Sequence, residues 1–88
     1  MKLAEIRKEI DEIDQALVEL LEKRMDCVSQ VLAAKKTSGQ EVTDKEREAE
    51  VLARVSELVK QEDYRETIQA TFADIMKESR KYQQSKLS

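Results

Sequence analysis

Two cationic side chains, Arg24 and Lys35, fall on the apolar stripe of a long helical pattern, where leucine and valine are expected. They are eleven residues apart, almost three full turns, so both point the same way with their Cα atoms about 16 Å apart. An unpaired charge on a buried face is costly. The pair therefore predicts a site for one small polyanion. A plainer interpretation is dipole compensation by Lys35 and an ion pair across a helical bundle for Arg24.

The other two helical patterns also carry polar residues on their apolar faces. Asp44, Arg47 and Glu48 lie at i, i+3 and i+4 at the start of the second pattern. Ser79 and Gln83 continue the apolar stripe of the third pattern. Each group alone is compatible with a solvated first turn or a frayed helix end. The same departure on all three helices favours a functional site.

Arg7 lies on the edge of the same stripe as Arg24 but 17 residues earlier, or about 25 Å along the helix axis. It cannot share a site with Arg24 of its own helix. An antiparallel partner helix would bring the two arginines together. From periodicity alone, an exposed arginine beside Lys8 and Asp11 is an equally good interpretation.

The first helix is expected over residues 3–36, which contain neither Gly nor Pro and whose apolar residues recur in steps of three and four. At about 1.5 Å per residue it spans about 50 Å, whereas a compact domain of this length is about 30 Å across. The overhanging apolar stripe needs a partner, and a second copy related by a twofold axis is the simplest. The sequence therefore predicts an all-α, three-helix subunit with a very long first helix, in an intertwined homodimer.

The second helix follows a polar loop expected at residues 37–42. A capping box formed by Thr43 and Glu46 predicts its start, and its apolar pattern fades near residue 61.

The third helix is predicted to open with a capping box of Asp63 and Glu66 and to end near residue 84. The tail at residues 85–88 is expected to fray. No linker interrupts the pattern, so residues 1–88 are predicted to form a single domain.

The composition narrows the chemistry that these residues can perform. The 88 residues include no histidine and one cysteine, Cys27, and 40% of them are charged. A zinc site, a Ser-His-Asp triad and a Cys-His pair are therefore excluded. Any catalysis must use Arg, Lys, Asp, Glu, Ser and Gln, which suit positioning and charge stabilisation better than nucleophilic attack, and no metal is expected.

The composition also limits partners and location. A net charge of −3 and the lack of a basic stripe with interleaved aromatic residues argue against nucleic acid. No apolar run approaches the roughly 20 residues that span a membrane, and residues 1–5 lack the apolar segment of a signal peptide. The single Cys27 excludes an internal disulfide and fits a reducing compartment. A cytoplasmic location is therefore expected, with no membrane partner.

Several short motifs, each weak alone, occur in a specific order and spacing over almost the whole chain. They are IRKEIDEID at residues 6–14, LLEKR at 20–24, AAK at 33–35, DKERE at 44–48, and Ser79 with Gln83. Together they resemble the all-helical class of chorismate mutases. The resemblance implies an intertwined dimer with two equivalent active sites. It also implies an isomerase without a cofactor that rearranges chorismate to prephenate, in the shikimate pathway toward Phe and Tyr.

The resemblance implies roles for individual residues. Arg24, together with Arg7 from the other chain, would clamp the two substrate carboxylates. Arg47 and Ser79 would complete the carboxylate side of the site.

The remaining roles concern the ether oxygen and the ring hydroxyl of the substrate. Lys35 and Gln83 would donate hydrogen bonds to the ether oxygen, which gains negative charge as its C–O bond breaks. Glu48, with Asp44 beside it, would hold the ring hydroxyl. The apolar wall would be formed by residues that helical packing explains equally well: Val28, Val31, Ile75 and Met76.

Two other functions fit the same sequence. Isochorismate pyruvate lyase resembles it in fold and in a stretch such as Arg24-Met25-Asp26, but those lyases typically lack an acid like Glu48. A non-catalytic helical dimer could instead bind a pathway metabolite or dock on another shikimate-pathway enzyme. A purely structural dimerisation domain leaves the polar residues on all three helices unexplained.

Overall fold

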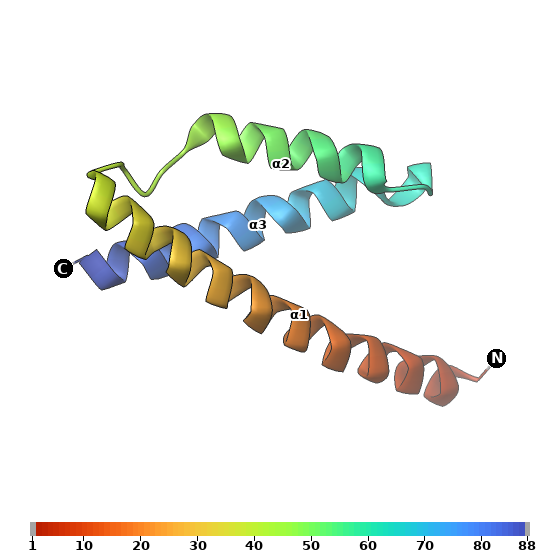
Figure 1. The fold of residues 1–88 in the computed structure, drawn as a ribbon. Coiled ribbons are helices and arrows are strands. Elements are labelled where there is room, and N and C mark those ends of the chain that lie inside the picture. The colour runs from red at the N-terminus through yellow and green to blue at the C-terminus, as the bar shows by residue number, and fades with distance from the viewer. Residues whose placement is uncertain (1, 88) are drawn as a thin grey trace.

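The computed structural model describes residues 2–87, which form three helices and no strand (Figure 1). Helix α1 spans Leu3–Ser38, α2 spans Lys45–Leu58 and α3 spans Glu62–Leu87. The predicted all-α class with a very long first helix is confirmed. Helices α2 and α3 form an antiparallel hairpin, and α3 also packs against α1, whereas the backbones of α1 and α2 do not approach each other closely.

Helix α1 is long because nothing in its sequence breaks it before Gly39. This glycine has φ 76°, in the left-handed region, and its backbone N–H donates to the carbonyl of Lys35. Glycine tolerates this conformation without steric cost, so it ends the helix. The helix continues two residues beyond the predicted end at residue 36, and the connection to α2 begins at Gly39 rather than at residue 37.

The amino end of α2 differs by one residue from the prediction. Asp44, not Thr43, is the N-cap, and its Oδ1 accepts a hydrogen bond from the Arg47 backbone N–H at 2.9 Å. Both residue types cap helices well, but a carboxylate is the stronger acceptor for the positive end of a helix. The predicted Thr43–Glu46 capping box is therefore wrong, although the position of the helix is right.

The carboxyl end of α2 is held by α3 through Arg65. Its Nε and Nη2 donate to the carbonyls of Ser56 and Val59, both at 2.8 Å. The last carbonyls of a helix have no partner within the helix, so this arginine supplies donors that would otherwise come from water. The α2–α3 hairpin is thereby closed at the end away from Gly39.

Helix α3 begins two residues earlier and ends later than predicted. Because it starts at Glu62, Asp63 lies in its first turn and is not its cap. Its carboxyl end stays helical to Leu87 instead of fraying, with Lys36 Nζ of α1 donating to the Lys86 carbonyl at 3.3 Å. Ser88, the last residue of the expected tail, lies outside the described residues.

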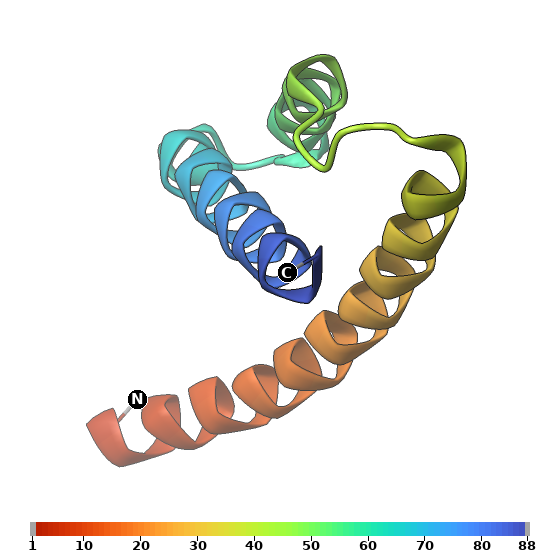
Figure 2. The ribbon, with the colours of Figure 1, turned by 90° about the vertical axis from the view of Figure 1, so that its left-hand side faces the viewer.

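The amino-terminal half of α1 projects from the rest of the chain, as Figures 1 and 2 show. Its apolar residues are exposed, for example Leu3 at 60% and Ile13 at 58%. The radius of gyration is 16.0 Å and the longest extent is 53 Å, whereas a compact domain of this length has a radius of about 12 Å. A single chain therefore leaves the first half of its longest apolar stripe uncovered.

None of the helices over residues 2–87 contains a stretch long and apolar enough to cross a membrane.

Candidate active site

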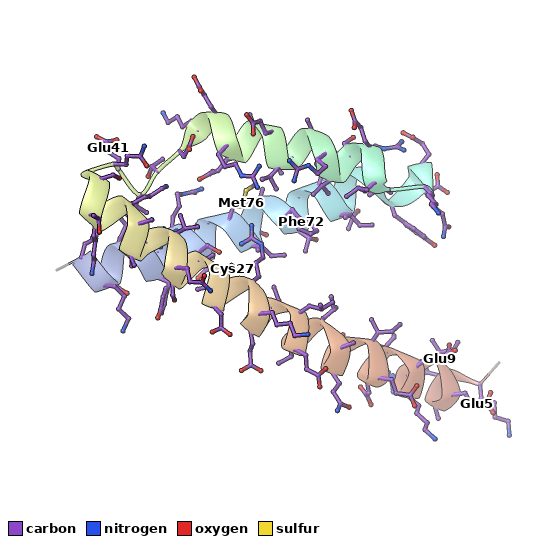
Figure 3. All side chains as sticks on the ribbon, viewed as in Figure 1. Glu5, Glu9, Cys27, Glu41, Phe72 and Met76 are labelled. Atoms are coloured by element: carbon purple, nitrogen blue, oxygen red, sulfur yellow. The ribbon has the colours of Figure 1, made fainter. Side chains whose placement is uncertain are left out.

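One cleft of about 290 Å³ opens between the carboxyl-terminal half of α1, the start of α2 and the carboxyl-terminal half of α3. In Figure 3, Cys27 and Met76 mark its α1 and α3 sides, while Glu5 and Glu9 lie far away near the free end of α1. The cleft is lined by residues from all three helices and the α1–α2 loop: Arg24, Cys27, Val28, Val31, Lys35, Val42, Asp44, Arg47, Glu48, Val51, Met76, Ser79, Arg80 and Gln83.

Seven of the eight residues predicted to bind a substrate line this cleft, although they come from three separate segments of the chain. They are Arg24, Lys35, Asp44, Arg47, Glu48, Ser79 and Gln83. Polar residues on apolar helix faces thus converge where the three faces meet. Of the predicted apolar wall, Val28, Val31 and Met76 line the cleft, whereas Ile75 is partly buried outside it.

Arg7 is the one predicted site residue that the fold does not bring to the cleft. It is exposed on the projecting half of α1, where it makes no hydrogen bond or ion pair with the other described residues. Its distance from Arg24 along the helix axis is about 25 Å, which no arginine side chain spans. Only another chain could bring an Arg7 to this cleft.

The α1 side of the cleft presents two partly buried cations that are held by single hydrogen bonds. Arg24 Nη1 donates to the Ser79 hydroxyl at 3.1 Å, and Lys35 Nζ donates to the Val42 carbonyl at 3.0 Å. A guanidinium has five N–H donors and an ammonium has three, so both retain donors for a ligand. Within residues 2–87 neither cation forms an ion pair with a carboxylate, which leaves both able to attract an anion.

The α2 side contributes the first turn of that helix. The Asp44 carboxylate caps the helix, as described above. Arg47 is exposed and its Nη1 lies 3.6 Å from Glu50 Oε2. Glu48 is partly buried and forms an ion pair with Arg80 of α3. Of the two cleft carboxylates, Glu48 is thus the one that reaches across to another helix.

The α3 side holds the two most buried polar residues of the site, Ser79 at 6% and Gln83 at 7% exposure. The Ser79 hydroxyl accepts from Arg24 and donates to the Ile75 carbonyl at 2.9 Å. Gln83 Nε2 donates to the Ser79 carbonyl at 3.2 Å, while Gln83 Oε1 is buried and has no hydrogen-bond partner among the described residues. A buried amide oxygen without a hydrogen bond is costly. An unpaired buried acceptor beside the cleft is expected if a polar ligand supplies the missing hydrogen bond.

The sequence prediction missed four lining residues: Cys27, Val42, Val51 and Arg80. A signal existed for Arg80, which lies three residues before Gln83 and four after Met76 and therefore shares their face of α3. Nothing in the sequence indicated Val42, because a loop residue has no helical spacing from which to place it.

The lining has the charge and the polarity of an anion site. Four cations, Arg24, Lys35, Arg47 and Arg80, outnumber the carboxylates of Asp44 and Glu48 by two. Over residues 2–87 there is no group of three or more His, Cys, Asp or Glu side chains that could hold a metal ion. With its excess of positive charge and its free N–H donors, the cleft is suited to a small anion.

Comparisons with known proteins point the same way. The chain is 36% identical over 80 residues to a protein of Methanocaldococcus jannaschii named chorismate mutase, an alignment that covers 91% of this chain and 81% of that protein. The sequence profile of the family described as chorismate mutase type II matches residues 6–84, which include every residue of the cleft. This chain therefore belongs to the type II chorismate mutases, a family of isomerases.

Proposed function

We propose that this protein converts chorismate to prephenate by Claisen rearrangement, at the branch of the shikimate pathway that leads to Phe and Tyr. The observation that carries the proposal is the convergence of Arg24, Lys35, Glu48 and Gln83 on one cleft with excess positive charge. Chorismate is a small dianion with two carboxylates, an ether oxygen and a ring hydroxyl. The reaction is pericyclic and uses no nucleophile, so a site of fixed charges and donors is sufficient.

In this mechanism Arg24 and Arg7 of the partner subunit each bind one carboxylate. Chorismate is flexible, and its reactive form is a compact diaxial conformer. Two fixed cations select that conformer and reduce the entropy still to be lost before the transition state. The hydroxyl of Ser79 supports this role by holding Arg24 Nη1 at 3.1 Å, and Arg47 adds a further cation.

Lys35 and Gln83 act on the ether oxygen. This oxygen gains negative charge as its C–O bond breaks, so donors aimed at it stabilise the transition state more than the substrate. The Val42 carbonyl supports the role of Lys35 by fixing its ammonium group while leaving two N–H donors free. Gln83 retains one amide N–H beside its bond to the Ser79 carbonyl.

Glu48 accepts the hydrogen bond of the ring hydroxyl. Asp44 lies beside it in the cleft lining, but its carboxylate already accepts from the Arg47 backbone. Glu48 also accepts one hydrogen bond, from Arg80, but it is partly buried whereas Asp44 is exposed. We therefore assign Glu48 to the ring hydroxyl, with Asp44 contributing charge nearby. An acid at this position also favours chorismate over isochorismate as the substrate, and so a mutase over a lyase.

The active unit is proposed to be an intertwined homodimer in which each Arg7 serves the cleft of the other chain. The exposed apolar half of α1 supports this, because a second copy would bury it. The absence of Arg7 from the cleft of its own chain supports it independently. A cytoplasmic location and docking on another enzyme of the pathway stay predictions.

Product analysis with purified protein tests the proposed activity. We expect chorismate to disappear and prephenate to form, with no pyruvate released from isochorismate supplied separately. Pyruvate from isochorismate without prephenate from chorismate would replace the mutase by the lyase. Turnover of neither substrate, together with no change in the melting temperature on adding chorismate, would contradict both and favour a purely structural dimerisation domain.

A further inference from the structure

An ion pair between α3 and α2 joins two residues of the cleft wall. Arg80 Nη1 donates to Glu48 Oε1, and both side chains are partly buried. Partial burial strengthens such a charge-assisted hydrogen bond relative to an exposed ion pair. It is the ion pair that links α2 to α3 among the described residues, since the other pairs lie within single helices.

The same bond fixes the carboxylate that the substrate needs. Glu48 lies in the first turn of α2, and a glutamate there has three rotatable side-chain bonds. With Oε1 held by Arg80, the carboxylate is confined to one position on the cleft wall. Its second oxygen, Oε2, has no hydrogen-bond partner within residues 2–87. The acceptor available to a ligand hydroxyl is thus preorganised before any ligand arrives.

Arg80 also reduces the charge repulsion between the Glu48 carboxylate and an anionic ligand. A dianionic ligand must approach the Glu48 carboxylate closely if that group accepts from its hydroxyl, and like charges repel. The Arg80 guanidinium, itself part of the cleft lining, neutralises Glu48 through its bond to Oε1. Without this cation the lining would hold three positive and two negative side chains instead of four and two.

We propose that Arg80 is a positioning residue that holds Glu48 so that its free oxygen accepts the hydrogen bond of the substrate's ring hydroxyl. Arg80 acts through Glu48 and does not touch the reacting atoms. This inference rests on the proposed function, because it assumes that Glu48 binds the hydroxyl of chorismate.

A double-mutant cycle tests the inference, using Arg80→Gln, Glu48→Gln and the double variant, with steady-state kinetics on chorismate. We expect each single change to lower kcat/KM by about 10- to 100-fold, the effect of one hydrogen bond to a charged group. The loss should appear mainly in KM, because the hydroxyl contact is made in substrate and transition state alike. The double variant should be no worse than Glu48→Gln by more than about threefold.

Lys77→Gln is the matched control, since Lys77 is an exposed cation one turn earlier on α3 and does not line the cleft. Its kcat/KM should stay within about twofold of the wild type. If Arg80→Gln does not fold, Arg80→Lys takes its place in the cycle, where it keeps the charge but loses the planar fork.

The outcomes separate the inference from the proposed function. Losses that multiply in the double variant would show that Arg80 acts independently of Glu48 and would overturn the inference. An Arg80→Gln enzyme with wild-type KM would do the same. A wild-type protein that does not turn over chorismate would overturn the proposed function, and with it this assignment.

Discussion

Alanine in place of Arg24 is expected to lower kcat/KM for chorismate by about 10³-fold. A guanidinium can bind a carboxylate through two parallel hydrogen bonds, and each charged hydrogen bond is worth about 1.5–3 kcal/mol. Arg24 is partly buried and lacks a carboxylate partner among the described residues, so its charge is available to the substrate. Its loss also removes the cation that would select the reactive conformer, and so both KM and kcat should suffer.

Two variants separate this role from a structural one. Lys23→Ala removes the neighbouring exposed cation and should keep kcat/KM within about twofold of the wild type. Arg24→Lys keeps the charge but not the fork, and should recover only part of the loss. Because Arg24 also bonds Ser79, the melting temperature must be measured beside the kinetics. An unfolded Arg24→Ala protein, or one with wild-type kinetics, would contradict the assignment.

Alanine in place of Lys35 is expected to lower kcat by about 10²- to 10³-fold, with a smaller change in KM. This is the size of effect seen when one donor to a developing oxyanion is removed. The ether oxygen carries little charge in the substrate and more in the transition state, so the missing ammonium is felt mainly in kcat. Steady-state kinetics over a full range of chorismate concentrations gives the two constants separately.

Lys36→Ala is the matched control for this variant. Lys36 is exposed and donates a hydrogen bond to the Lys86 carbonyl. The substitution therefore removes one lysine and one interhelical hydrogen bond without changing the cleft lining. Lys35→Ala also frees the Val42 carbonyl and hence the loop before α2. A rise in KM with kcat unchanged would mean that Lys35 only binds substrate or orders this loop, and would contradict its action on the ether oxygen.

The helices were predictable because their signals are local. A run of residues 3–36 without Gly or Pro predicts a long helix, and the structure extends it only to Ser38. The helix ends were less predictable. Thr43 and Asp44 are both good N-caps, and the choice between them depends on which backbone N–H groups the loop leaves in reach.

The cleft was predictable where a residue departs from the pattern around it. Arg24 and Gln83 are polar residues within apolar stripes, so they can be identified as candidate site residues from the sequence alone. Arg80 shares the face of Met76 and Gln83, but this spacing alone does not distinguish it from an ordinary charged residue on an exposed helix. Its role becomes visible only when α2 brings Glu48 within hydrogen-bond distance.

Other contacts cannot be predicted from the types of the residues that make them. The bond from Lys35 to the Val42 carbonyl uses a backbone group that every residue has, so no sequence pattern indicates it. The proposed pairing of Arg7 with Arg24 of a second chain cannot be read from the geometry of one chain. Only the excess length of α1 and its exposed apolar stripe indicate that such a chain is needed.

Subunit mixing tests most directly the central claim that two chains form one chorismate-rearranging site. Equal amounts of the inactive Arg7→Ala and Arg24→Ala proteins are unfolded together, refolded and assayed for prephenate, beside each variant refolded alone. Half of the randomly formed dimers would be mixed, and each would hold one site with both arginines intact, so we predict about one quarter of wild-type activity. Activity no greater than that of the two variants refolded separately would contradict a site shared between chains.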